Sequence, residues 1–192
     1  MEEKQPWKLP DHPLRFPVVT AKGDRLESVS LRAFSVSEHR EAIAKAGEHE
    51  DDHFEALLRL ASGLSVEDLE EIKRPDYVSL SRLIHEYVSL PASYFQGRVP
   101  ENPDSVELLV PVKGIGRTIE RLDLEVPPMK VTKAMRKLKT DDERADFCSA
   151  HCTGLSVPEV QRLSVPDWTQ LQGRLNSFLN KPADFFPKMT ST

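Results

Sequence analysis

Cysteine is scarce in this 192-residue chain, and both residues, Cys148 and Cys152, lie in its second half. Two cysteines cannot form the disulfide framework on which many small secreted domains depend. No apolar run approaches the roughly 18 residues that a membrane-spanning helix needs. The first residues are charged and interrupted by proline, so we expect no signal peptide. These absences predict a cytoplasmic protein without a membrane segment.

Familiar catalytic patterns are also missing. The chain contains neither the GxSxG pattern of serine hydrolases nor a phosphate-binding P-loop. Gly114 and Gly116 are too few for a dinucleotide-binding fingerprint, and they fall between two predicted strands, where a hairpin turn explains them. We therefore expect no enzyme activity and assign no catalytic or cofactor-binding residue.

Two clusters could suggest a metal site. His49 and His53 flank an acidic run, but the second half lacks histidines at the equivalent positions, so a polar helix start explains them better. Cys148 and Cys152 flank His151 without the second ligand pair that structural zinc requires. In the internal repeat described below, both cysteines align with apolar residues, which predicts buried thiols. We assign no metal ligand.

A basic balance is absent as well. The chain is 39% hydrophobic and 30% charged, with a formal net charge of −5. This composition is typical of a folded soluble protein and lacks the overall positive charge of a protein that binds phosphate backbones. Nucleic acid is therefore not the expected partner.

The chain does contain an internal repeat. Residues 63–95 align without a gap to residues 154–186 at a constant offset of 91. Gly-Leu-Ser-Val and Pro-Asp-aromatic segments recur, and apolar positions keep their character. Such self-similarity predicts one structural unit made twice, each copy about 90 residues long.

Each half carries the same order of predicted elements. Strand-like segments at 14–19 and 26–32 flank a turn, and segments at 106–112 and 118–126 match them. Helical patterns follow. The sequence thus predicts an α+β fold with two tandem copies of a small domain, each a β-hairpin followed by three or four short helices. We expect a flexible N-terminal arm at 1–12, repeat domains at 13–95 and 106–186, a linker at 96–105 and a tail at 187–192.

Capping residues explain the polar positions that both halves share. Ser65 with Asp68, and Ser156 with Glu159, have the spacing of a capping box. Asp76 and Asp167 each follow a proline, so we predict them as N-caps of the last helix. The predicted buried face of that helix comprises Leu80, Ile84, Tyr87 and Val88 in the first copy, and Leu171, Leu175, Phe178 and Leu179 in the second.

The charge of one helix differs between the halves. Residues 129–140, predicted as a helix, are basic, and the counterpart at 37–52 is acidic; the basic side chains that we select are Lys130, Lys133, Arg136 and Lys137. One interpretation is two solvated faces of unlike sign. The other is a surface for an acidic partner, or for the acidic half of a second copy in head-to-tail association.

Paired aromatic residues end each repeat. They are Tyr94-Phe95 in the first half and Phe185-Phe186 in the second. These rings are candidate exposed contacts for a partner. Closing the core is the alternative, because both copies keep them at the end of an element.

Taken in order, the signals resemble those of the Mu-like phage tail assembly chaperone family of contractile-tailed phages and prophages. The residues that carry the resemblance are Leu31-Arg32, Ser62-Gly63-Leu64-Ser65, Pro75-Asp76-Tyr77 and Leu80, with Thr153-Gly154-Leu155-Ser156, Pro166-Asp167-Trp168 and Leu171 in the second half. Most members of the family look like single units, and this chain is duplicated.

The resemblance implies a non-catalytic protein without cofactors that works in the host cytoplasm. Such proteins are thought to bind the long, helical tape-measure protein and keep it soluble while tail-tube protein polymerises around it. The alternative is a small nucleic-acid-binding regulator that uses the basic helix 129–140. The acidic composition opposes that alternative, and retention on DNA at low salt tests it.

Overall fold

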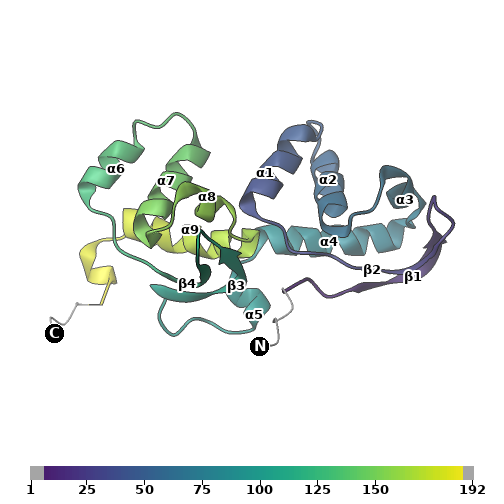
Figure 1. Ribbon diagram of the computed structural model, residues 1–192, viewed down its shortest axis with the longest axis horizontal. Coiled ribbons are helices and arrows are strands. Elements are labelled where there is room, and N and C mark those ends of the chain that lie inside the picture. The colour runs from purple at the N-terminus through teal and green to yellow at the C-terminus, as the bar shows by residue number, and fades with distance from the viewer. Residues whose placement is uncertain (1–6, 188–192) are drawn as a thin grey trace.

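The computed structural model describes residues 7–187 and confirms an α+β protein made of two tandem copies of one unit (Figure 1). The first repeat consists of β1 (His12–Val19), β2 (Arg25–Val29), α1 (Val36–Lys45), α2 (Glu50–Ser62), α3 (Val66–Glu71), α4 (Arg74–Ser89) and α5 (Ala92–Gln96). The second consists of β3 (Ser105–Lys113), β4 (Thr118–Asp123), α6 (Met129–Met135), α7 (Asp141–Thr153), α8 (Val157–Gln161), α9 (Val165–Asn180) and the 3-10 turn η1 (Ala183–Phe185).

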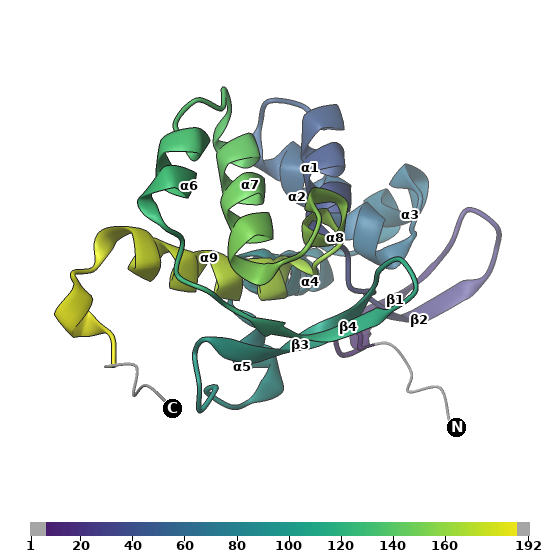
Figure 2. The same cartoon turned by 60° about the vertical axis from the view of Figure 1, so that its left-hand side comes forward.

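The long helices α4 and α9 form the base of the two repeats. Figure 1 shows α1, α2, α3, α6, α7 and α8 on one side of this base, and Figure 2 shows the second hairpin and the short helix α5 on the other. Helices α2 and α7 begin and end at equivalent positions of the repeat, as do α4 and α9. The internal repeat therefore predicts the placement of these helices correctly.

Local sequence signals set the helix ends. Ser35 accepts from the backbone N–H of Glu38, whose carboxylate accepts from the N–H of Ser35, and Thr140 with Glu143 repeats this capping box before α7. Gly63 ends α2 with φ of 72°, a left-handed conformation that costs glycine little, and its counterpart after α7 has φ of 68°. Both signals satisfy backbone groups that a helix end leaves unpaired.

One predicted capping box is only half formed. The Ser65 hydroxyl accepts from the N–H of Asp68, but the Asp68 carboxylate accepts from the N–H of Ala21 in the first hairpin turn. In the second repeat Glu159 does return to the N–H of Ser156. Asp68 thus ties α3 to the hairpin as well as starting a helix.

Each repeat has its own apolar core. Leu58, Ile84 and Tyr87 are fully buried in the first, and Val160 and Leu171 in the second. The predicted buried faces of α4 and α9 largely form these cores. Leu179 is an exception, because its side chain is 38% exposed at the free end of the second repeat.

The chain packs against the first repeat before β1 begins. Trp7 stacks on Tyr87 with ring centroids 6.2 Å apart and meets Phe95 edge-on at 5.5 Å. Leu9 is buried, and its N–H donates to the carbonyl of Leu31 at 3.2 Å. Residues 7–11 therefore contribute to the core of the first repeat, although their composition suggests a flexible arm; residues 1–6 lie outside the described part of the chain.

Backbone pairing and a buried apolar side chain contribute to the joint between the two repeats. The N–H of Val36 donates to the carbonyl of Leu163, and the N–H of Val165 donates to that of Phe34, at 3.0 and 3.3 Å. The Val165 side chain belongs to the second repeat but is buried in the core of the first. This joint makes the two repeats one packed body.

Candidate functional site

The duplicated aspartates bind strand backbone and do not cap their helices. The N-caps of α4 and α9 are Lys73 and Ser164, so the predicted N-cap role is wrong. Asp76 lies in the first turn of α4, and its carboxylate accepts from the N–H groups of Arg15 and Phe16, both at 2.9 Å. These donors belong to β1, so Asp76 fastens the hairpin to the helix.

Asp167 performs the same task in the second repeat. It accepts from the N–H groups of Leu109 and Val110 at 2.7 and 3.2 Å, and the Ser164 hydroxyl donates to it at 2.6 Å. In both hairpins the strand register shifts where these donors lie, between Pro13 and Val18 in β1. A bulged strand leaves N–H groups without a ladder partner, and the buried aspartates accept from them.

The two carboxylates differ in their titration. Burial raises the pKa of Asp167 to about 6, against the opposing effect of its three donors. Burial acts in the same direction on Asp76, but the N–H groups of Arg15 and Phe16, together with His12, hold its pKa below the ordinary value. Both carboxylates therefore have a structural task.

Residues 49–53 match the letters of the H-E-x-x-H pattern of zinc proteases. That pattern needs both histidines on one turn of a helix. His49 instead precedes α2 in extended backbone, as its N-cap, and His53 lies within the helix. Over residues 7–187 no group of three or more His, Cys, Asp or Glu side chains is placed to hold a metal.

The two cysteines are core residues. Cys148 and Cys152 are both buried, and their sulfur atoms are 4.0 Å apart. Leu57 and Ala61, at the equivalent positions of the first repeat, are buried as well. The neighbouring Cys148 thiol and burial raise the pKa of Cys152, which keeps it protonated. The thiols therefore act as small apolar side chains.

The basic segment is shorter as a helix than predicted. Helix α6 ends at Met135, so Lys130 and Lys133 lie on it, Arg136 is its C-cap, and Lys137 lies in the turn beyond. The next helix requires this break, because its N-cap Thr140 has extended backbone. Arg144 then donates to the carbonyls of Leu138 and Lys139 and holds the turn.

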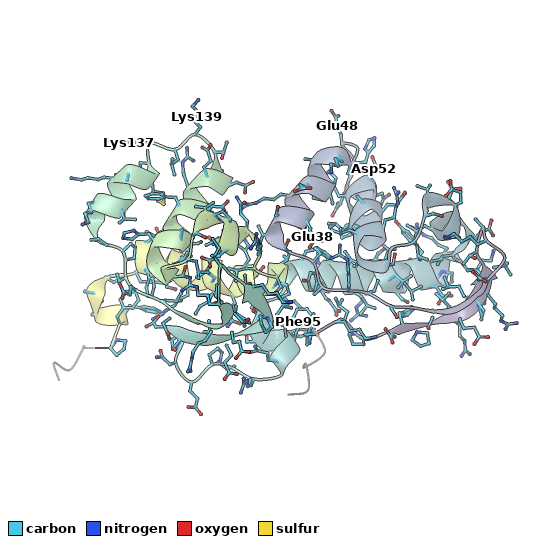
Figure 3. The ribbon with its side chains drawn as sticks, in the orientation of Figure 1. Glu38, Glu48, Asp52, Phe95, Lys137 and Lys139 are labelled. Carbon is cyan, nitrogen blue, oxygen red and sulfur yellow. The ribbon has the colours of Figure 1, made fainter. Side chains whose placement is uncertain are left out.

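Equivalent tips of the two repeats carry opposite charge. Figure 3 shows Lys137 and Lys139 at the tip between α6 and α7, and Glu48 and Asp52 at the tip between α1 and α2. Glu48 and Lys139 occupy equivalent positions of the repeat. The charge asymmetry of the sequence is thus displayed on matching surfaces.

Each aromatic pair is divided between core and solvent. Tyr94 and Phe185 are 57% and 51% exposed. Phe95 packs against Trp7, and Phe186 lies 5.7 Å from the ring of Phe178. The first ring of each pair is therefore exposed and the second packs against apolar side chains, and a partner contact at the exposed rings stays a prediction.

The largest hollow described is a groove between α1 and α2, with a volume of about 880 Å³. Its apolar lining residues are small or half-buried, and they are Ala42, Ala46, Ala56, Leu60 and Leu64. Charged side chains line it from both helices, four carboxylates and two cations: Glu38, Glu41, Asp52 and Glu55, with Lys45 and Arg59. Our sequence analysis missed this groove, although alanines four residues apart at 42 and 46 hint at a helix face open to close approach.

Arg40 links the two repeats electrostatically. Its guanidinium donates to Asp146 at 2.9 Å, approaches Asp142 at 3.1 Å, and lies 5.4 Å from the centre of the Trp168 ring. Asp146 is buried and also accepts from Gln161. A basic side chain of the first repeat therefore meets paired acids on α7 of the second.

No helix within residues 7–187 has both the length and the apolar character to cross a bilayer.

Comparison with known proteins gives one family. A family model described as phage tail assembly chaperone proteins, E, or 41 or 14, matches the chain twice, over residues 11–88 and 105–180. No curated protein and no solved structure matches the chain. Since the two matches coincide with the two repeats and cover most of the chain, this protein belongs to the phage tail assembly chaperone family.

Proposed function

We propose that the chain acts in the host cytoplasm as a non-catalytic assembly chaperone that binds the tape-measure protein. Membership of the tail assembly chaperone family supports a role in assembly. The observation that carries the choice of partner is the groove between α1 and α2. A long apolar helical chain aggregates unless its apolar face is covered, and a groove between two helices can cover it.

The lining of the groove fits a helical ligand. Alanines on facing helices let the backbone of a third helix come close, and Leu60 and Leu64 offer apolar surface. The four carboxylates outnumber Lys45 and Arg59 in the lining, so the groove favours a segment that carries lysine or arginine beside its apolar face. Stoichiometric binding of this kind needs no reacting group.

The first repeat is the proposed binding unit. In the second repeat Phe147 and His151 stand where the groove has Ala56 and Leu60. A phenylalanine at the first of these positions occupies volume that the alanine leaves open. The duplication thus supplies one copy with a groove and one copy with a different surface.

The test is co-expression with the tape-measure protein encoded by the same phage or prophage. We expect a soluble complex with the chain and an insoluble tape-measure protein without it. Ala56→Phe, which copies the residue of the second repeat, should abolish the complex. Ala21→Phe, in the exposed hairpin turn, is the matched control and should leave it unchanged.

Two results would overturn the proposal. Failure of the wild-type chain to solubilise or capture the tape-measure protein would remove this partner. A complex that survives Ala56→Phe would remove the groove as its site. Retention of the purified chain on DNA that weakens steeply with salt would instead support the nucleic-acid alternative.

A further inference from the structure

At the joint, one face of the first repeat packs against a different face of the second repeat. Because the two repeats share one fold, each repeat carries a counterpart of both faces. The trailing face, on the first repeat at the joint, is formed by Ser35, Val36, His39, Arg40 and Val88. The leading face, on the second repeat, is formed by Asp142, Asp146, Val165, Trp168 and Thr169. The leading face of the first repeat and the trailing face of the second have no repeat against them within the chain (Figure 1).

The free leading face is apolar at its centre and acidic at its edge. Tyr77 and Val78 stand at the positions of Trp168 and Thr169, and Val78 is 53% exposed. Asp51 and Glu55 stand at the positions of Asp142 and Asp146, the two acids that hold Arg40 at the joint. The acidic pair of the joint is therefore present again on an open surface.

The free trailing face is also apolar, and it is basic. Met129 and Leu179 stand at the positions of Val36 and Val88 and are 64% and 38% exposed, and Val126 in the segment before α6 is also exposed. Lys133 stands at the position of Arg40, and Lys130 lies about one turn of α6 before it. Exposed apolar side chains with a charged rim are typical of an interaction surface.

One side chain of the joint changes on the free leading face. At the joint, Val165 is buried in the first core and its N–H donates to the carbonyl of Phe34. The equivalent position on the free leading face holds Arg74, whose guanidinium lies 5.5 Å from the centre of the Tyr77 ring. A buried apolar side chain at the joint is thus replaced by a charged one at the free end.

We propose that copies of this chain associate head to tail, with the free trailing face of one copy against the free leading face of the next. The contact repeats the joint between the repeats, with Lys130 and Lys133 approaching Asp51 and Glu55. It is weaker than the joint and sensitive to salt, because charged groups replace the Val165 contact and the chain is not continuous across it. A heterologous contact of this kind builds rings or filaments.

Sedimentation velocity of the purified full chain tests the proposal. At low salt the mean sedimentation coefficient should rise with concentration, and at high salt it should return to that of a monomer. Lys130→Glu/Lys133→Glu removes the trailing face, and Asp51→Lys/Val78→Lys removes the leading face. Each variant alone should remain monomeric, whereas Lys22→Glu/Arg25→Glu, with the same change of net charge as the first, should assemble like the wild type.

Mixing the two defective variants is the decisive step. Each retains the face that the other has lost, so an equimolar mixture should form dimers and no larger species. A symmetric dimer through one face would not be restored in this way. Circular dichroism melting checks that each variant is folded. Met129→Asp, at the start of α6, is a second trailing-face variant if Lys130→Glu/Lys133→Glu unfolds.

Three results would overturn the proposal. They are a wild-type chain that stays monomeric at low salt and high concentration, folded variants that assemble unchanged, and a mixture that stays monomeric. The free leading face shares Glu55 with the α1–α2 groove, and none of the substitutions above changes a residue that lines the groove. Loss of self-association with retained tape-measure binding therefore separates this proposal from the function proposed above.

Discussion

The two repeats share a skeleton and differ in their surfaces. Both attach a bulged hairpin to the last long helix through a buried aspartate, and both end the second helix with a left-handed glycine. Their outer helices differ in length and in charge, with α1 acidic around its groove and α6 short and basic. Duplication thus preserved the contacts that form each repeat and let the exposed faces diverge, because surface substitutions cost little stability.

The aspartate attachment offers the largest test of what the repeats share. Asp76→Ala leaves two strand N–H groups without acceptors, and we expect it to lower the free energy of unfolding by about 3 kcal/mol. Asp167→Ala should cost less at neutral pH, because burial already disfavours the ionised form of Asp167. Urea unfolding at pH 7 measures both. Asp68→Ala is the control, because it removes one exposed hydrogen bond, to the N–H of Ala21. An equally small loss of stability in all three variants would contradict the role of the buried aspartates in holding the hairpins.

The pH dependence should separate the two aspartates. Between about pH 4 and pH 6 the folded chain keeps a proton on Asp167 that the unfolded chain releases, so the free energy of unfolding falls as pH rises, by about 3 kcal/mol at most. Asp76 affects the pH dependence of stability in the opposite direction, because its pKa in the folded chain is lowered. Its contribution to the free energy of unfolding is present at neutral pH. It is lost as the pH falls below the ordinary pKa of an aspartate.

The measurement is urea unfolding across this pH window for the wild type and for Asp167→Asn. The variant should lose the fall in stability between pH 4 and pH 6 and retain the other pH-dependent effects of the chain. Parallel curves for the two proteins would show that Asp167 does not titrate in this range.

The joint can be tested through its apolar contact. Val165→Ala should cost about 2 kcal/mol, because it leaves a cavity in the core of the other repeat. Fluorescence of Trp7, in the first core, and Trp168, at the joint, should then report separate transitions instead of one. Arg74→Ala, the equivalent change on the free leading face, should leave a single transition at nearly unchanged denaturant concentration.

Arg40 gives the smallest expected effect. Arg40→Ala removes the cation beside Asp142 and Asp146, and we expect a loss of about 1.5 kcal/mol, measured by thermal unfolding. Arg82→Ala breaks an exposed ion pair within α4 and should stay within about 0.5 kcal/mol of the wild type. Equal losses would mean that Arg40 contributes no more than a surface pair.

Sequence patterns predicted the parts of the fold that depend on neighbouring residues. The capping boxes before α1 and α7 and the glycine after α2 each act within about four residues, so they can be read directly. Predictions failed where distant segments compete for the same residue. The basic helix stops at Met135 because the next helix needs its own start, and Asp76 turns from its own helix to a strand about sixty positions away.

The sequence alone determined that this chain is one small α+β unit made twice, because periodicity, caps and turn residues encode each unit locally. Its family also followed from short motifs at a constant offset. Only the tertiary structure decided that Asp76 and Asp167 hold bulged strands, that α1 and α2 enclose a groove, and that Val165 belongs to the core of the other repeat. The physical reason is that burial and pairing depend on the whole folded surface, whereas a helix start depends on a few adjacent residues.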